Sequence, residues 1–376
     1  AMSGMTTTGA TVFTGLDTLP VGINLWRALM QWFGGIGIIV VAMVFLPELR
    51  VGGMQIFRSE AFDTMGKILP RATEIAARIS VIYLGLTILC GLVYAALGMP
   101  GFDALIHALT TVSTGGFSNR DASFGVYQGA LEYAAVVFMI LASLPFVRYI
   151  QLIAGTAQPL YRDSQVRAYL VTIAIIVLAL ALYRTFTQGA APETSLREAL
   201  FNVTSIISGT GYSSTDYQLW GGVAVVAFFF AGLIGGCAGS TTCSIKVFRY
   251  QLLFASVSTQ VRRLYAPHGV FEPRYEGRPV AEEVVSSVMA FFVLFFVALG
   301  VLSVLLGLTD LDVITSVSGA AAALGNIGPG LGEIIGPAGN AEINDAAKWI
   351  LAAAMLIGRL ELIAVLVLFT AAFWRG

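Results

Sequence analysis

Charged side chains are scarce in this sequence. Only 11% of its 376 residues are Asp, Glu, Lys or Arg, whereas 57% are hydrophobic, and the mean hydropathy is +0.82. A chain this apolar does not belong to the ordinary soluble proteins. The formal net charge of -1 gives no basis for binding nucleic acid, because that partner selects basic surfaces.

Cysteine and histidine are also rare. The cysteines are Cys90, Cys237 and Cys243, and the histidines are His107 and His268. They support neither a disulfide framework nor a zinc site, although Cys237 and Cys243 stay open as a redox or metal pair. The sequence also lacks a Ser/His pair, paired intramembrane aspartates and any nucleotide-binding fingerprint. We therefore predict no enzyme and no organic cofactor.

Long apolar stretches are abundant, and no cleavable signal peptide is visible. A helix needs roughly 20 residues to cross the hydrocarbon of a bilayer. We expect spans from the stretches at Ile23–Leu46, Ile79–Leu97, Tyr133–Leu152, Tyr169–Tyr183, Val223–Ile234, Val284–Leu308 and Trp349–Trp374. The chain is thus predicted to be an all-α, multi-pass membrane protein that sits in a lipid bilayer.

Four short segments rich in Gly, Thr and Ser are too polar to span lipid. Loops 1 to 4 are Thr6-Thr7-Thr8-Gly9-Ala10-Thr11, Ser113-Thr114-Gly115-Gly116-Phe117-Ser118, Ser208-Gly209-Thr210-Gly211-Tyr212-Ser213 and Gly325-Asn326-Ile327-Gly328-Pro329-Gly330. Aligning Gly9, Gly116, Gly211 and Gly328 reveals a period of about a hundred residues. One structural unit is therefore predicted to occur four times.

Loops 2 to 4 each follow a short apolar stretch of about a dozen residues, Phe102–Val112, Ser195–Ile207 and Leu311–Leu324. A helix of that length spans about 18 Å, which is enough to enter a membrane halfway. Acids stand near the starts of these stretches, where they complement the helix dipole: Asp103, Glu193, Glu198, Asp310 and Asp312. The predicted unit is helix, half-helix, extended loop and helix.

Irregular backbone is tolerated at membrane depth only where it is buried or faces a water-filled cavity. We therefore expect the four loops to meet at one central pore, with ordinary surface loops as the alternative. Glycine can adopt positive φ and turn successive carbonyl oxygens towards one axis, where they replace the hydration shell of a monovalent cation. The loop cores contain no Asp or Glu, which disfavours divalent ions. These features leave potassium or sodium open.

The same four loops resemble the filter loops of the TrkH/KtrB superfamily of potassium transporters. The resemblance runs the whole length and includes Trp32-Phe33-Gly34-Gly35-Ile36-Gly37, Pro70-Arg71-Ala72, Gly235-Gly236-Cys237-Ala238-Gly239-Ser240-Thr241-Thr242 and Gly358-Arg359-Leu360-Glu361. The last run and the pattern from Asn326 to Gly330 are similar to the TrkH branch. Members of that branch have further helices before their first filter loop, so we expect an N-terminal part to precede residue 1.

The resemblance implies potassium as the transported ion and a set of selectivity-filter residues. These are Thr7, Thr8, Gly9, Thr114, Gly115, Gly116, Gly209, Thr210, Gly211, Asn326, Ile327 and Gly328. It implies uptake through a channel-like pore of four pseudo-repeats, the first incomplete, at residues 1–48, 49–157, 158–257 and 258–376. A sodium- or proton-coupled cation symporter of the same superfamily is the alternative.

The apolar region from Tyr217 to Val257 is too long to be one span, at about 60 Å as a helix. The predicted break is the run at residues 235–244, whose small and hydroxyl-bearing side chains can satisfy freed backbone groups. The resemblance makes this run a gating loop, with a helix-packing face as the alternative. The implied gate residues are Gly235, Gly236, Gly239, Ser240, Thr241, Thr242 and Arg359. Thr242-Cys243-Ser244 departs from the small residues or glycine usual there.

Arg359 lies about 15 Å into an apolar run. A charge at that depth is a functional candidate by default, and the resemblance implies that it projects into the pore beside the gating loop. The alternative is an arginine that bridges two helices through Glu132 or Glu361. Glu361 is only two residues away and points to another face, so the two side chains cannot simply neutralise each other.

Basic residues gather in the connections between repeats, which the positive-inside rule makes cytoplasmic. They are Arg50, Arg58, Lys67, Arg71, Arg78, Arg148, Arg162, Arg167, Lys246, Arg249, Arg262, Arg263, Arg274 and Arg278. Acids predominate beside the half-helices, so we expect an outer mouth that attracts cations. The resemblance further implies the bacterial inner membrane, a homodimer and a cytosolic, nucleotide-binding TrkA-type partner.

Overall fold

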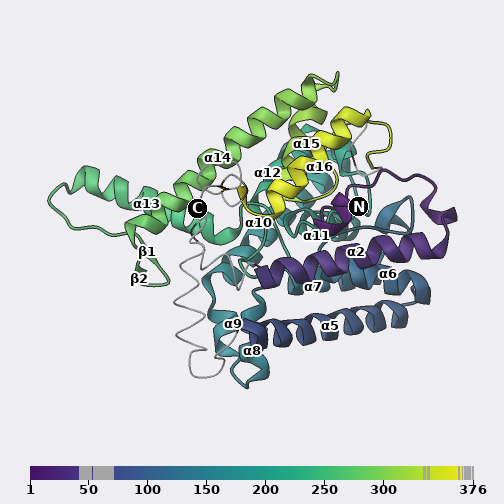
Figure 1. The fold of residues 1–376 in the computed structure, drawn as a ribbon, viewed down its shortest axis with the longest axis horizontal. Coiled ribbons are helices and arrows are strands. Elements are labelled where there is room, and N and C mark those ends of the chain that lie inside the picture. The colour runs from purple at the N-terminus through teal and green to yellow at the C-terminus, as the bar shows by residue number, and fades with distance from the viewer. Residues whose placement is uncertain are drawn as a thin grey trace.

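The computed structural model describes residues 1–41, 53, 72–332, 336, 339–362, 365, 367 and 374. Its helices, in chain order, are α1 (Met2–Met5), η1 (Leu16–Thr18), α2 (Val21–Val40), α5 (Ala72–Ala96), α6 (Gly101–Val112), η3 (Ser123–Val126), α7 (Ala130–Ala142), α8 (Phe146–Ile153), α9 (Gln158–Arg162), α10 (Ser164–Gln188), α11 (Pro192–Ile207), η4 (Tyr217–Trp220), α12 (Gly222–Ile234), α13 (Val247–Tyr265), α14 (Glu282–Gly307), α15 (Val313–Gly325) and α16 (Asp345–Arg359). Figure 1 shows their arrangement.

Within the described part of the chain, four helices are long and apolar enough to cross a membrane. They are α2, Glu74–Ala96 of α5, α10 and α14. Large apolar side chains such as Val81, Leu178 and Val304 are more than half exposed on these helices. Water would make such surfaces unfavourable, whereas lipid solvates them. The predicted multi-pass, helical character of the chain is therefore confirmed.

The three predicted half-helices are present as α6, α11 and α15. Each packs against the long helix that precedes it in the chain, giving the pairs α5 with α6, α10 with α11, and α14 with α15. Helix α11 begins at Pro192, three residues before the predicted start, because proline is tolerated in the first turn of a helix. The short helices end where loops 2 to 4 begin.

The sequence predicts one span at Tyr133–Leu152, but this stretch is not a single continuous helix. It divides into α7 and α8, whose axes differ in direction by 91°. Pro145 stands directly before α8 and has no N–H to donate to the preceding turn. The hydroxyl of Ser143 donates to the carbonyl of Met139 at 2.7 Å and closes the end of α7.

The predicted break after loop 3 is observed between α12 and α13, and it covers residues 235–246. We call this segment the α12–α13 loop. The stretch Trp349–Trp374 also differs from the prediction, because α16 ends at Arg359. Glu361 has φ +63°, a left-handed conformation that a right-handed helix cannot contain.

The all-α prediction needs one correction outside the helical body. The connection after α13 holds a two-stranded antiparallel hairpin, β1 (Arg274–Tyr275) with β2 (Arg278–Pro279). Helix α13 and this hairpin extend away from the other helices in Figure 1. The predicted boundary between residues 48 and 49 lies outside the described residues, as do Arg50, Arg58, Lys67 and Arg71.

Candidate functional site

The four loops share one backbone conformation. Two residues before each aligned glycine, φ is positive, at Thr7 (+50°), Thr114 (+50°), Gly209 (+72°) and Asn326 (+51°). The aligned glycines also have positive φ, with Gly9 at +87°, Gly116 at +71°, Gly211 at +77° and Gly328 at +97°. The alternation of left-handed residues explains why glycine recurs at the aligned position, where it adopts this conformation without strain.

The same conformation ends the helix before each loop. The N–H of Thr8, Gly115 and Ile327 each donates to a carbonyl five residues earlier, at 2.9, 2.9 and 3.0 Å. Gly211 donates similarly to the carbonyl of Ser205 at 3.1 Å. Such bonds satisfy carbonyls that the last turn leaves free. The C-termini of the helices, which carry partial negative charge, are thereby fixed beside the loops.

The loops touch one another in cyclic order. A Cβ atom on Gly9 would overlap the carbonyl oxygen of Gly115 in loop 2, and one on Gly116 would overlap that of Thr210 in loop 3. A Cβ on Gly211 would overlap the carbonyl oxygen of Ile327 in loop 4. Loop 4 in turn contacts loop 1, because a Cβ on Gly328 would lie 2.7 Å from the carbonyl oxygen of Thr8.

One cavity is lined by all four aligned glycines, together with Thr11, Ser118, Asp121 and Asn340. The residues that precede the glycines are buried behind this surface, at 0% exposure for Thr8 and Thr210 and 4% for Ile327. The structure therefore brings loops 1 to 4, which contain all twelve predicted filter residues, around one cavity that their aligned glycines line.

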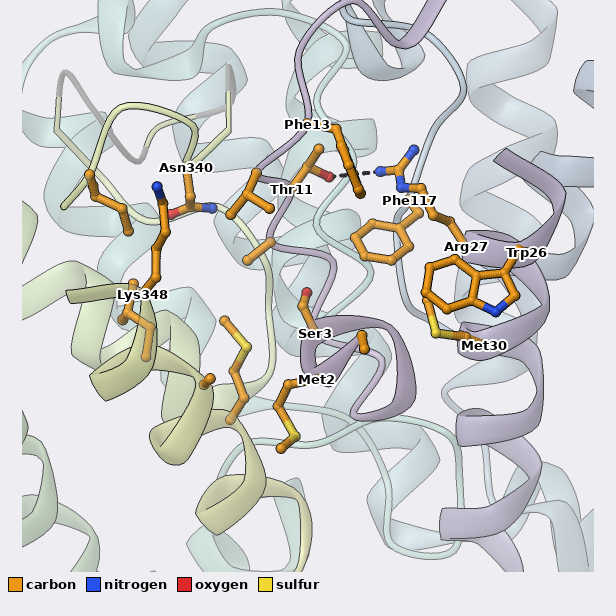
Figure 2. A pocket seen from close by; sticks show the side chains of 17 residues that line it. Met2, Ser3, Thr11, Phe13, Trp26, Arg27, Met30, Phe117, Asn340 and Lys348 are labelled. Carbon is orange, nitrogen blue, oxygen red and sulfur yellow. Dashed lines mark hydrogen bonds between the residues drawn. The ribbon is translucent and has the colours of Figure 1, made fainter. Parts of the chain in front are cut away.

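Arg27 supports the loops from α2, a role that its sequence position alone did not indicate. Its guanidinium donates to the carbonyl of Ser118 at 3.0 Å and to the hydroxyl of Thr11 at 3.1 Å. The guanidinium also lies over the ring of Phe117, 4.4 Å from its centroid. Figure 2 shows Arg27 reaching from α2 towards Thr11, with Phe117 alongside. Arg27 thus ties the ends of loops 1 and 2 together.

Tyr212, directly after Gly211, supports loop 3 in a similar way. Its hydroxyl lies 2.5 Å from that of Thr110 and 3.2 Å from that of Thr111, and it donates to the carbonyl of His107 at 3.2 Å. All three partners belong to α6. Loop 3 is therefore fastened to the half-helix of loop 2, and a lone tyrosine in the sequence does not reveal that partner.

Three of the acids on the side of the half-helices form ion pairs with arginines. Arg120 contacts Asp17 at 3.1 Å and Asp103 at 2.6 Å, and Arg184 contacts Glu198 at 2.5 Å. The backbone N–H of Asp121 and the Arg120 guanidinium hold the pKa of Asp17 below its ordinary value. These pairs weaken the attraction for cations that the sequence predicts from the excess of acids alone.

The α12–α13 loop is buried throughout most of its length and is anchored to the break between α7 and α8. The N–H of Cys237 donates to the carbonyl of Ser143 at 3.1 Å, and the carbonyl of Gly239 accepts from the N–H of Phe146 at 2.9 Å. The hydroxyl of Thr241 donates to the carbonyl of Ala142 at 3.0 Å. Two broken helices therefore satisfy each other's free backbone groups, as membrane depth requires.

Arg359 contacts this loop and is 5% exposed. Its Nη1 donates to the carbonyl of Thr241 at 3.2 Å and lies against the thiol of Cys243, while Nη2 donates to the carbonyl of Gly34 at 3.4 Å. The predicted proximity of Arg359 to the loop is therefore present. Glu132, its suggested alternative partner, pairs with Arg197 instead.

Glu361 binds the far end of the same loop. Its carboxylate contacts Lys246 at 3.2 Å and Arg249 at 2.6 Å. Arg249 is fully buried and its guanidinium lies 3.7 Å from the ring centroid of Phe291. The sequence did not indicate this cluster, because Glu361 lies 115 residues from Lys246 and 112 residues from Arg249 in the chain. Across the described residues, no group of three or more His, Cys, Asp or Glu side chains can hold a metal ion.

The fold and this site define a class: a multi-pass helical membrane protein whose buried site is made of backbone and arginine instead of titratable catalytic groups. The family TrkH, described as cation transport protein, matches residues 1–375, and the chain belongs to this family. It is a family of transporters and not of enzymes. The predicted membership is confirmed.

Its relatives are bacterial proteins. The chain is 46% identical to the Trk system potassium uptake protein TrkI of Halomonas elongata, over 100% of this chain and 77% of that protein. It is 38% identical to the Trk system potassium uptake protein TrkH of Vibrio parahaemolyticus, over 100% of this chain and 79% of that protein. The crystal structure of the potassium transporter TrkH from Vibrio parahaemolyticus superposes with a TM-score of 0.89 at 35% identity, covering 99% of this chain and 77% of that chain.

Proposed function

We propose that the chain conducts potassium ions into the bacterial cell through a channel-like pore whose selectivity filter is made of loops 1 to 4. The observation that carries this proposal is the closed circle of contacts from Gly9 to Gly115, Gly116 to Thr210, Gly211 to Ile327, and Gly328 to Thr8. Four loops that touch in cyclic order enclose one axis. Membership of the TrkH family and relatives named as potassium uptake proteins support the choice of ion.

The chemistry of the loops suits a dehydrated monovalent cation. Carbonyl oxygens of the loops replace water around the ion, and the partial negative charge at the ends of α6, α11 and α15 adds to the attraction. The loop cores carry no carboxylate, and hard divalent ions require such ligands. In this proposal residues 1–48, 49–157, 158–257 and 258–376 are four pseudo-equivalent units, the first incomplete.

The α12–α13 loop and Arg359 form the gate in this proposal. The loop occupies the break in a helix that follows loop 3, and Arg359 holds it through the carbonyl of Thr241. A fixed positive charge below the filter repels potassium, and the loop blocks its path. Opening therefore requires the loop to leave Arg359. The buried positions of Gly235, Gly236, Gly239, Ser240 and Thr242 agree with a closed gate.

The relatives' names place them in Trk systems, so we extend the proposal to a homodimer in the bacterial inner membrane with a TrkA-type cytosolic subunit. Helix α13 leaves the helical body (Figure 1), and its last turn carries Arg262 and Arg263. Basic side chains on an extended helix suit a docking surface for that subunit.

Potassium flux from vesicles that contain the purified protein tests this function. We expect potassium to flow down its own gradient, more readily than sodium, with no sodium or proton gradient present. A strict requirement for a sodium or proton gradient would instead support the symporter alternative. Bound-ion density between the four aligned glycines in an experimental structure would test the filter directly, and density elsewhere along the pore alone would oppose it.

A further inference from the structure

Loop 2 differs from the other loops at the residue before the aligned glycine. Loops 1, 3 and 4 have Thr8, Thr210 and Ile327 there, and each of these side chains is buried. Loop 2 has Gly115, which is followed by Gly116. Two adjacent glycines give a chain more conformational freedom than one, so loop 2 needs another source of rigidity if its carbonyls are to hold a fixed position.

Gln31 of α2 occupies the space that a side chain at position 115 would fill. A Cβ on Gly115 would lie 2.8 Å from the Nε2 atom of Gln31 and would overlap the rest of its carboxamide. Gln31 has 0% exposure although it belongs to an apolar, membrane-length helix. A glutamine in that position is unfavourable unless both ends of its amide have partners.

The amide of Gln31 finds both partners in loop 2. Nε2 donates to the carbonyl oxygen of Gly115 at 2.6 Å, and Oε1 accepts from the N–H of Phe117 at 3.0 Å. The two bonds span Gly116. They also fix the orientation of the amide, because a carbonyl can only accept and a backbone N–H can only donate.

We propose that Gln31 is a positioning residue of the selectivity filter. From α2, Gln31 restrains loop 2 in the way that a buried side chain restrains each of the other loops. The carbonyl that it holds is the one that faces Gly9 of loop 1. Gln31 thereby sets the contact between loops 1 and 2. This inference rests on the proposed function, because it assigns Gln31 a part in selectivity.

A double-mutant cycle tests the exchange of restraint between Gln31 and position 115. Gln31→Ala leaves loop 2 unrestrained, and Gly115→Thr places a side chain where the amide of Gln31 lies. We expect each single variant to lower the preference for potassium over sodium about tenfold, a change of about 1.4 kcal/mol. The double variant has a threonine at position 115, like those of loops 1 and 3, and the space to hold it. On a logarithmic scale, it should recover at least half of the potassium-over-sodium preference that a single variant loses.

Selectivity is measured as the ratio of potassium to sodium flux from vesicles that contain the full protein. The melting temperature of each variant reports whether it folds. Gln31→Met, which keeps the volume but removes both hydrogen bonds, replaces Gln31→Ala if the latter does not fold. The matched control is Gln218→Ala. Nε2 of Gln218 donates to the carbonyl of Gly332 at 3.3 Å, and its Oε1 accepts from the N–H of the same residue at 2.6 Å, but Gly332 lies outside the filter residues.

Lost selectivity in the Gln31 variants, normal selectivity in Gln218→Ala and recovery in the double variant would support the proposal. Normal selectivity in folded Gln31 variants, or additive losses in the double variant, would overturn it. Gly116→Ser separates this result from a failure of the filter itself. If Gly116→Ser loses selectivity and the Gln31 variants do not, only the role of Gln31 is wrong; if neither loses selectivity, the proposed filter is wrong.

Discussion

Serine at position 116 is the sharpest perturbation of the proposed filter. Gly116 has φ +71°, and an added Cβ would overlap the carbonyl oxygen of Thr210. The substitution therefore has two effects. It strains the backbone of loop 2, and it pushes on a carbonyl of loop 3 that is proposed to contact the ion.

The two effects can be separated in size. A left-handed conformation costs a residue other than glycine about 1–2 kcal/mol. Gly189 has nearly the same φ, +66°, but a Cβ there meets nothing within 4 Å. Gly189→Ser therefore carries the backbone strain alone. Displacement of the Thr210 carbonyl acts directly on the ion, and a change of 1.4 kcal/mol in relative binding is tenfold, so we expect Gly116→Ser to lower selectivity at least tenfold.

Paired potassium and sodium fluxes from vesicles, with melting temperatures for the parent and both variants, measure these effects. We expect Gly116→Ser to lose more stability than Gly189→Ser, because it adds the overlap with the Thr210 carbonyl to the backbone strain, and only Gly116→Ser to lose selectivity. The carbonyl mechanism is falsified if folded Gly116→Ser selects potassium as well as the parent does. An equal loss of selectivity in Gly189→Ser would show that general strain, and not the contact with Thr210, is responsible.

Three further perturbations address the gate and the half-helices. Arg359→Ala removes the charge against the α12–α13 loop, so it should raise potassium flux and reduce its dependence on the proposed cytosolic subunit. Lower flux in a folded variant with normal filter occupancy would refute the proposed barrier. Glu361→Gln removes the carboxylate shared by Lys246 and Arg249 and should destabilise the fold by about 3–5 kcal/mol, whereas an unchanged melting temperature would mean that water reaches the cluster. Asp312→Ala removes the N-cap of α15 and should cost about 1 kcal/mol. Hydrogen bonds from Thr315 and from backbone N–H groups lower the pKa of Asp312, so the stabilisation by its carboxylate should be complete at neutral pH and decline as the pH falls through that lowered pKa. A difference in melting temperature between parent and variant that does not shrink as the pH falls below the ordinary Asp pKa would contradict this cause.

The helices and loops could be predicted because their causes are local. Long apolar runs specify spans in any bilayer protein, and the positive φ at Gly116 and Gly211 favours glycine, which adopts it without strain. Breaks were harder to place. Pro145 marked the end of α7 in the sequence, but the apolar residues on both sides of it suggested one span. Glu361 gave no local signal that α16 would end before it.

The supports behind the loops could not be predicted because their partners are distant in the chain. Gln31 and Tyr212 are visible as polar residues in apolar surroundings, which indicates that each needs a hydrogen bond. The sequence does not say that Gln31 reaches loop 2 or that Tyr212 reaches α6. These contacts depend on how one unit packs against the next, and that packing cannot be predicted from a single sequence.

The end of α16 shows how two residues with opposite charges can contact one loop, the proposed gate, without neutralising each other. Arg359 binds the middle of the α12–α13 loop through Thr241, whereas Glu361 binds Lys246 at the end of that loop and Arg249 in the first turn of α13. One short segment of the fourth unit therefore holds the loop at two points. In the proposed gate, a movement of α13 would displace the ion pairs of Glu361 before or while the loop leaves Arg359. Residues two apart do not share a face even within a helix, so Arg359 and Glu361 reach two separate targets from one short segment.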